Sequence, residues 1–375
     1  MKIGLLGHGV VGSGVRKIID DNHIPGVEIK RILVHTEKEI IDKSLMTTNV
    51  DVILQDPEID IVVECMGGIE PARSYALRAM QSGKNFVTSN KKMLASSFSE
   101  LLKCAKKNHV TIGYEASCGG GIPWMANLER IRRIEEIQAF RGILNGTTNY
   151  ILSRMYQEKQ AFDAMLKDAQ KLGYAERDPS DDIDGLDVRY KVALSCAKAF
   201  GRMIDVEQIP TFGIRNIQKG DLEYGREIGC VIKLVGKANL DGMAVVMPVF
   251  VKQEDIFASI PLNYNAIECA SASLGLATFI GQGAGSLPTA HAVVQDVLDV
   301  VNGVATLQDC HLATVNNTSV EGKYYVRTTQ REAFEGYIEQ EAKCGFLTKK
   351  MCIEKLCDLV RKSKDEAIFV AEVMK

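Results

Sequence analysis

The chain has 375 residues, of which 46% are hydrophobic and 25% are charged, and its formal net charge is −3. This composition is typical of a globular protein with a substantial core, and the length allows two domains with a small third. The near-neutral charge gives no electrostatic reason to expect nucleic acid or an anionic membrane surface as a partner.

The cysteines and the apolar segments argue against further classes of protein. The ten cysteines include no C-x-x-C pair, which argues against a zinc site. No uninterrupted apolar stretch approaches the ~18 residues of a membrane helix, and Met1–Gly12 is typical of a strand and loop rather than a secretion signal. Free thiols without such a signal predict a cytoplasmic protein.

The first 130 residues alternate short apolar runs with helical stretches. This alternation predicts βαβ units and a Rossmann-type parallel sheet, so residues 1–130 are expected to form a dinucleotide-binding domain of the α/β class. The expected strands are Lys2–Leu6, Glu28–Val34, Ile59–Glu64, Asn85–Thr88 and Val110–Gly113, and the expected helices are Val11–Asp20, Pro71–Ser82 and Ser97–Lys107.

A different rhythm extends over residues 131–288. Strands without intervening helices predict a mostly antiparallel layer, and therefore an α+β substrate-binding and dimerisation domain. The expected strands are Gln138–Leu144, Cys230–Ala238, Ala244–Val251 and Thr278–Ile280, and the expected helices cover Tyr150–Leu172 and Gly185–Phe200. A further helix, Thr289–Val301, is apolar enough to pack back onto the first domain.

A glycine motif follows the first strand and opens a helix. Gly7-His8-Gly9-Val10-Val11-Gly12 matches G-x-G-x-x-G, in which glycines let the backbone approach a pyrophosphate at a helix N-terminus. A merely structural turn is the alternative. The position inside a βαβ alternation favours cofactor binding, with Gly7, Gly9, Val10, Val11 and Gly12 as the candidate residues.

The residues that recognise the ribose of such a cofactor are expected at the end of the second strand. There the sequence reads Ile32-Leu33-Val34-His35-Thr36, with no carboxylate at the tip. A carboxylate would favour NAD, whereas its absence leaves room for a 2′-phosphate near Arg31, His35 or Lys38. The sequence therefore favours NADP and leaves NAD open, and merely polar surface residues are the alternative.

Two lysines lie where chemistry is plausible on sequence grounds. Lys91 follows a strand and would lie at the carboxyl edge of the sheet, where ligands bind in such folds, although most lysines are simply solvated. Lys191 follows the acidic run Asp178–Asp187. A calcium loop fails there, because its twelfth position would be Lys191 instead of glutamate. Asp187 and Lys191 share one helix face, as a surface ion pair or as a catalytic pair.

Several segments together resemble the homoserine dehydrogenase family, in order over about residues 1–305. They are Gly7–Gly14, Val87–Leu94, Tyr114–Pro123, Arg141–Tyr150, Leu172–Asp187 with Lys191, and Gly281–Gly285 followed by Pro288-Thr289-Ala290. The resemblance implies NAD(P)-dependent interconversion of L-homoserine and L-aspartate 4-semialdehyde, in threonine, methionine and isoleucine biosynthesis. No fused aspartokinase is expected, since nothing precedes the first strand.

The resemblance also implies roles for single residues. Lys191 is the expected acid/base, Lys91 is expected between nicotinamide and substrate, and Asp187 is expected to assist catalysis. The substrate pocket is expected to use Glu176, Asp182, Asp187, Gly146, Thr147 and Tyr174, with the substrate carboxylate on backbone amides around Gly146–Thr148. Gly283 and Lys91 are expected to contact the cofactor. Sodium or another monovalent cation is expected at Glu115, through its carbonyl or carboxylate, and at the backbones of Cys118, Gly120 and Ile122, with a merely tight turn as the alternative.

The remaining expectations concern partners and rival functions. A homodimer or higher homo-oligomer is expected through the middle domain, because the run Ala244–Val251 would leave an apolar sheet face to cover. The partner is otherwise a small-molecule substrate. Another two-domain NAD(P)-dependent amino-acid or sugar-acid dehydrogenase is one alternative. A non-catalytic cofactor sensor is the other, and it would be expected to lack one of the key lysines or carboxylates.

The tail, residues 320–375, resembles a shortened ACT-like module of the βαββαβ type, in which threonine regulates many members of the family. The expected elements are the strand Lys323–Arg327, the helix Glu332–Ala342, one strand Gly345–Lys349 where two are usual, the helix Cys352–Lys362 and the strand Ala367–Val373. No glycine follows the first strand. The tail is therefore expected to act as a stabilising cap that binds threonine poorly.

Overall fold

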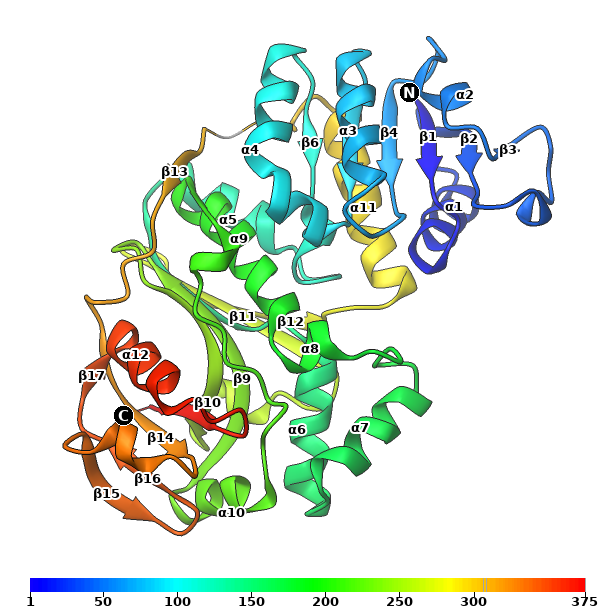
Figure 1. Ribbon diagram of the computed structural model, residues 1–375. Helices are drawn as coiled ribbons and strands as arrows, with labels where there is room; N and C mark the ends of the chain where they lie inside the picture. The colour runs from blue at the N-terminus through cyan, green and yellow to red at the C-terminus, as the bar shows by residue number, and fades with distance from the viewer. Residues whose placement is uncertain (306, 308, 375) are drawn as a thin grey trace. The chain divides into compact units, whose positions relative to one another are not determined.

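The computed structural model describes residues 1–305, 307 and 309–374 (Figure 1). The chain divides into two compact units. Unit 1 contains Met1–Arg133, Ala197–Met203 and Gln282–His311, and unit 2 contains Ile134–Cys196, Ile204–Gly281 and Leu312–Lys375. Among the described residues, no helix is long and apolar enough to cross a membrane.

Unit 1 is built on a six-stranded parallel sheet in the order β3-β2-β1-β4-β5-β6. Its strands are β1 (Lys2–Leu6), β2 (Glu28–Leu33), β3 (Met46–Thr47), β4 (Ile61–Glu64), β5 (Asn85–Thr88) and β6 (Ile112–Gly113). β1 and β4 are almost wholly buried because their apolar side chains face helices on both sides of the sheet. The expected Rossmann-type parallel sheet is confirmed.

The helices of unit 1 pack in pairs against this sheet (Figure 1). α1 packs on α11, where a Cβ on Gly14 would lie 3.0 Å from the Cβ of Ala290, and α3 packs on α4. The helical elements are α1 (Val10–Asn22), η1 (Glu37–Glu39), α2 (Asp51–Leu54), α3 (Ala72–Gln81), α4 (Lys91–Lys107), η2 (Glu115–Ser117), α5 (Trp124–Arg132) and α11 (Ser286–Val301). α11 thus belongs to unit 1 and packs on α1.

Unit 2 is built on a ten-stranded mixed sheet in the order β12-β11-β7-β9-β10-β18-β14-β16-β15, with β17 paired to β14. β10 and β18 pair in parallel, and the other pairs with a described register are antiparallel. The strands are β7 (Ile137–Ile143), β9 (Cys230–Asn239), β10 (Ala244–Lys252), β11 (Tyr264–Ser271), β12 (Gly275–Gln282), β14 (Glu321–Arg327), β15 (Ile338–Ala342), β16 (Gly345–Thr348), β17 (Met351–Cys352) and β18 (Phe369–Val373).

The helical elements of unit 2 include those that carry the acidic segment and its lysine. They are α6 (Gly146–Glu158), α7 (Phe162–Lys171), α8 (Ser180–Ile183), α9 (Leu186–Phe200, which runs on into unit 1), η3 (Val206–Gln208), α10 (Lys219–Glu227), η4 (Ile256–Ser259), η5 (Arg331–Phe334) and α12 (Ile353–Ser363). Two short strands, β8 (Arg202–Ile204) and β13 (His311–Ala313), lie where the chain passes from one unit to the other.

The expectation that β10 leaves an apolar face uncovered is wrong. β10 lies between β9 and β18, and Ala244 to Val251 are all buried. Unit 2 instead exposes apolar side chains on the edge strand β12, where Leu276 is 69% and Ile280 is 49% exposed. A run of apolar residues predicts a strand well, but it does not tell whether that strand lies in the centre or at the edge of the sheet.

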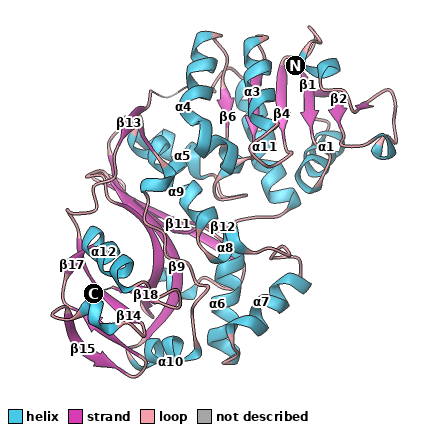
Figure 2. Ribbon diagram, viewed as in Figure 1, coloured by secondary structure: helices cyan, strands magenta, loops and turns pink. Residues whose placement is uncertain are grey.

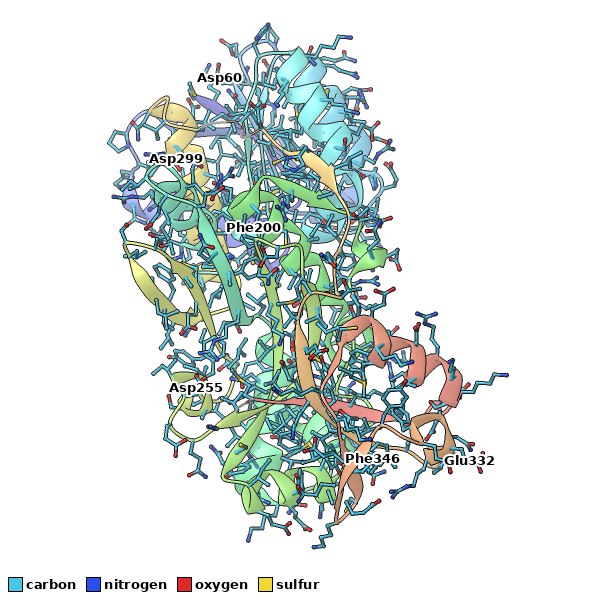
Figure 3. The ribbon with its side chains drawn as sticks, turned by 90° about the vertical axis from the view of Figure 1, so that its left-hand side faces the viewer. Asp60, Phe200, Asp255, Asp299, Glu332 and Phe346 are labelled. Atoms are coloured by element: carbon cyan, nitrogen blue, oxygen red, sulfur yellow. The ribbon has the colours of Figure 1, made fainter. Side chains whose placement is uncertain are left out.

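The tail continues the sheet of unit 2 through β18, and between η5 and α12 it contains the three strands β15, β16 and β17 where one was expected. The expected helix Glu332–Ala342 is wrong: η5 is followed by Gly336 at φ +80°, and Ile338–Ala342 then pairs with β16. Glu332 in η5 and Phe346 in β16 are labelled in Figure 3. Within the tail, the described α-helix is α12, shown in cyan beside the strands in Figure 2.

Candidate active site

The glycine motif of unit 1 forms the turn between β1 and α1. Gly7 adopts φ +97°, and its amide donates to the Leu33 carbonyl at 3.0 Å. A Cβ on Gly12 would lie 2.0 Å from the Gly7 carbonyl oxygen, whereas a Cβ on Gly9 would meet nothing within 4 Å. The turn is therefore closed on its inner side and open at Gly9, where a helix N-terminus can receive a pyrophosphate.

The tip of β2 differs from what the sequence predicts, because Glu39 folds back onto it. The Glu39 carboxylate accepts the Thr36 hydroxyl at 2.9 Å and the His35 amide at 3.4 Å. The hydrogen bond from Thr36 lowers the pKa of Glu39, which keeps the carboxylate ionised. Arg31, expected as a phosphate partner, donates instead to the backbone carbonyls of Lys30 and Ser44. The tip thus carries a carboxylate that the linear sequence did not indicate.

Lys91 lies at the carboxyl edge of the sheet of unit 1, as the first residue of α4. The Asn90 side chain caps this helix by accepting the Met93 amide at 3.1 Å. Nearby, the fully buried Glu64 ends β4 and accepts the Thr88 hydroxyl and the Met66 amide, each at 2.6 Å. Burial raises the pKa of Glu64. In the sequence, the only signal for Glu64 is that a lone acid ends an otherwise apolar strand.

The segment expected to bind a cation lies against Gly283. Gly119 and Gly120 adopt φ +88° and +59°, and a Cβ on Gly120 would lie 2.4 Å from the Gly283 carbonyl carbon. Cys118 and Ile122 are buried on either side of this turn. Only glycine permits so close an approach of two backbones, so the structure brings Gly283 and three of the four expected cation ligands together.

Glu115, the fourth expected ligand, is buried and caps α5. Its two carboxylate oxygens accept the amides of Met125 at 3.0 Å and Ala126 at 2.6 Å. Burial raises the pKa of Glu115 to about 7. Its own amide donates to Asp296 at 2.8 Å. Within the described residues, no group of three or more His, Cys, Asp or Glu side chains is arranged to hold a metal ion.

A cavity of about 500 Å³ in unit 1 opens beside Glu115. Its lining combines acidic and basic side chains, among them Glu115, Glu129, Lys198, Asp296 and Asp299. Asp299 is labelled in Figure 3. Glu115 and Ile122, two of the expected cation ligands, are among the residues that line this cavity.

In unit 2, Asp187 and Lys191 form a buried ion pair on the first turns of α9. The Lys191 ammonium donates to Asp187 at 2.8 Å and to the Leu144 carbonyl at 2.6 Å. The two residues are only 6% and 7% exposed. The alternative of a surface ion pair is therefore excluded. A buried amine bonded to a carboxylate is suited to transferring a proton to or from a substrate oxygen.

Asn145 joins this pair to the rest of the acidic segment. Its side-chain amide donates to Asp182 at 2.7 Å and to Asp187 at 2.9 Å, while its oxygen accepts the Thr148 amide at 2.8 Å as the cap of α6. Because the cap fixes the orientation of Asn145, the amide group also fixes both carboxylates. Asn145 was not among the predicted site residues, although an asparagine ahead of Gly-Thr-Thr is a helix-cap signal in the sequence.

The other expected pocket residues lie around the start of α6. Thr147 donates to the Tyr174 carbonyl at 2.6 Å, and a Cβ on Gly146 would lie only 2.7 Å from the Asn263 carbonyl oxygen. Tyr174 is 41% exposed. The Glu176 side chain is also exposed, and its backbone carbonyl accepts Gln170 at 3.0 Å. The structure thus gathers Asp182, Asp187 and Lys191 directly, whereas Glu176 lies at the surface of the unit.

Comparison with known proteins gives one family over most of the chain. The model for the homoserine dehydrogenase NAD-binding domain matches residues 7–115, and the homoserine dehydrogenase model matches residues 123–298. A homoserine dehydrogenase of Synechocystis is 41% identical over 325 residues, covering 82% of this chain and 75% of that protein.

Solved structures agree with this result. A homoserine dehydrogenase from Thiobacillus denitrificans has a TM-score of 0.88 and 30% identity, covering 100% of this chain and 98% of that chain. A hyperthermophilic archaeal homoserine dehydrogenase in complex with NADPH has a TM-score of 0.72, covering 82% of this chain and 99% of that chain. Its 24% identity supports the fold alone. From the match of sequence and structure, the chain belongs to the homoserine dehydrogenase family of NAD(P)-dependent oxidoreductases.

Proposed function

We propose that Lys191 is the acid/base in the interconversion of L-homoserine and L-aspartate 4-semialdehyde. The observation that carries this proposal is the buried hydrogen bond of 2.8 Å between Lys191 and Asp187. A bound nicotinamide supplies the hydride in reduction and accepts it in oxidation. Lys191 donates the proton to the aldehyde oxygen, or removes it from the alcohol, while Asp187 and the Leu144 carbonyl hold the amine in position.

The amino-acid end of the substrate is assigned to the acidic segment. Glu176 and Asp182 are assigned to the substrate ammonium, which their negative charge attracts. Asp187 is assigned to the region of the substrate hydroxyl. Gly146, Thr147 and Tyr174 line the same pocket. The Thr148 amide is already bonded to Asn145, so the substrate carboxylate is assigned to the amides of Gly146 and Thr147 at the start of α6.

A nicotinamide dinucleotide fits the open turn at Gly9, and Gly7, Gly9, Val10, Val11 and Gly12 would hold its pyrophosphate. Lys91 and Gly283 are assigned to its nicotinamide end. The lack of a carboxylate in the sequence directly after β2 favours NADP. The Glu39 carboxylate, which is hydrogen-bonded at this tip, favours NAD instead.

A monovalent cation, with sodium as first candidate, is proposed for the turn of Glu115, Cys118, Gly120 and Ile122. The fit rests on the left-handed glycines at 119 and 120, which turn a short backbone segment within a buried region. Backbone carbonyls of such a turn, with the Glu115 carboxylate, are the hard oxygen ligands that these cations prefer. A rise in melting temperature with NaCl over choline chloride at equal ionic strength tests the site, with Glu115→Gln as the variant expected to lose the difference.

We also propose a cytoplasmic biosynthetic enzyme in the formation of threonine, methionine and isoleucine, acting on a small molecule and not on nucleic acid. A homo-oligomer is proposed through β12 instead of β10. Leu276 and Ile280 on this edge strand, with Leu274 just before it, are exposed apolar side chains that a second copy of the chain would cover.

The deciding experiment is steady-state oxidation of homoserine with NAD and with NADP, beside a panel of other amino and hydroxy acids. We expect turnover of homoserine with at least one cofactor and a kcat/KM at least tenfold above that of the other alcohols. An equal or better substrate among the other amino or sugar acids would overturn the assignment and favour a different dehydrogenase on the same fold.

A further inference from the structure

The end of β2 lies directly beside the glycine motif. β2 pairs in parallel with β1, with Leu6 opposite Leu33, and the Gly7 amide donates to the Leu33 carbonyl. In a fold of this type the adenosine ribose of a dinucleotide reaches the residues just beyond the second strand. Whatever charge stands at this tip therefore faces the ribose 2′ position.

Glu39 supplies that charge. Both of its carboxylate oxygens are bonded at the tip, one to the Thr36 hydroxyl and one to the His35 amide. The residue is exposed, so a ligand can reach it. Each carboxylate oxygen has about two acceptor sites, which leaves capacity for two further donors such as a pair of ribose hydroxyls.

We propose that the Glu39 carboxylate receives the adenosine ribose hydroxyls and makes the chain select NAD over NADP. This inference rests on the proposed use of a nicotinamide dinucleotide. The hydroxyls of NAD donate to the carboxylate, whereas the 2′-phosphate of NADP offers only negative oxygens and replaces one of the donors. The negative charges of the carboxylate and of the 2′-phosphate repel each other, and the hydrogen bonds that NADP cannot make further weaken its binding relative to that of NAD.

Of the positive groups expected to balance a 2′-phosphate, Arg31 is engaged elsewhere, whereas Lys38 is exposed between Glu37 and Glu39 in η1. Arg31 is bonded to the carbonyls of Lys30 and Ser44. Burial and the nearby Arg16 lower the pKa of His8, so its ring is neutral at pH 7 and above. Two more carboxylates of this segment are bonded to other groups: Glu37 accepts the Thr48 hydroxyl, and Asp42 accepts the Ser44 amide.

A purely structural role for Glu39 makes a different prediction. Thr36 precedes η1 and Glu39 is its third residue, which is the spacing of a capping box. Glutamine serves a capping box as well as glutamate does, but it carries no charge. Glu39→Gln therefore separates the two roles, because it keeps the local fold and removes the repulsion.

The experiment measures dissociation constants of NADH and NADPH by cofactor fluorescence, together with kcat/KM for NAD and NADP. We expect wild type to prefer the NAD form by about tenfold or more, and Glu39→Gln to reduce that ratio at least about fivefold, mainly through tighter NADPH binding. Glu37→Gln removes the same charge two residues away and is expected to change the ratio less than about twofold, because Glu37 is bonded to Thr48 and not to the tip.

Each outcome decides one of the two proposals. Preference for NADPH in wild type, or equal effects of Glu39→Gln and Glu37→Gln, would overturn the role of Glu39 while leaving homoserine oxidation intact. Preferential NADH binding that depends on Glu39, without any homoserine turnover, would uphold the inference and overturn the proposed function.

Discussion

The Asp187–Lys191 pair and the tip of β2 each present a carboxylate to a ligand, but in opposite environments. Asp187 and Lys191 are buried and bonded to each other, whereas Glu39 is exposed and bonded to a loop. Removing one member of a buried pair leaves an uncompensated charge, whereas an exposed charge acts through repulsion that salt screens. We therefore expect changes in the buried pair to affect turnover and changes at the exposed tip to affect the choice of cofactor.

The strongest test of this contrast is Lys191→Ala. Loss of a positioned acid/base is expected to lower kcat by about 10²–10⁴-fold, and NADH affinity should stay within about twofold, because Lys191 lies in unit 2 and acts on the proton. Steady-state kinetics and cofactor fluorescence measure the two effects. Retention of a tenth of the wild-type kcat would move the acid/base role to Lys91 or to water.

Lys191→Met serves as the control for stability. It keeps the length of the side chain and removes the charge, and Asp187 still accepts the amide of Asn145. If both variants melt near the wild-type temperature and both lose turnover, the loss is chemical. If Lys191→Ala is instead unfolded at the assay temperature while Lys191→Met is folded and active, the lysine only supports the fold.

Glu176→Ala tests an exposed charge in unit 2 and thus refines the comparison. The substrate ammonium should lose an ion-pair partner, so homoserine KM is expected to rise by about tenfold with little change in kcat or melting temperature. Glu254→Ala, another exposed glutamate of the same unit, is the matched control and should leave KM unchanged. An unchanged KM in Glu176→Ala would remove Glu176 from the pocket.

The two regions also differ in how far sequence predicts them. Asp187 and Lys191 are four residues apart, and a helix brings such residues together whatever the rest of the fold does. Glu39 lies beyond the strand tip and reaches it only because η1 turns the chain back, which depends on loop conformation. The same limit explains Ile338–Ala342, whose helix-like composition yields to a turn at Gly336 and pairing with β16.

The expectation of an uncovered apolar face at Ala244–Val251 was wrong for a related reason, and β12 of the same predicted domain offers an exposed apolar edge instead. Leu276→Asp should disrupt a homo-oligomer formed through this strand, because a charge in an apolar interface is costly to bury. Light scattering at micromolar concentration is expected to show a dimer or larger for wild type and a smaller species for the variant. An unchanged circular dichroism spectrum of Leu276→Asp separates this effect from damage to the sheet.

The smallest expected effect is that of threonine on the forward reaction. In the tail, Asp365 accepts the Thr329 amide at 2.8 Å and the Thr328 hydroxyl at 2.6 Å, so a carboxylate already occupies the backbone that follows β14. A second carboxylate, that of a free amino acid, would be repelled there.

The tail is also tied into unit 2, which supports its expected role as a cap. The Arg327 guanidinium donates a hydrogen bond to the fully buried Asp221, and β18 pairs with β10. We therefore expect 1 mM threonine to lower the rate of aspartate semialdehyde reduction by less than about twofold. If the dissociation constant of threonine is above 1 mM, less than half of the enzyme has threonine bound. Asp365→Asn makes the test more specific. If the Asp365 carboxylate blocks the site, threonine should inhibit this variant more strongly than it inhibits wild type. Strong inhibition of wild type at submillimolar threonine would contradict the cap and show that the tail is a working sensor.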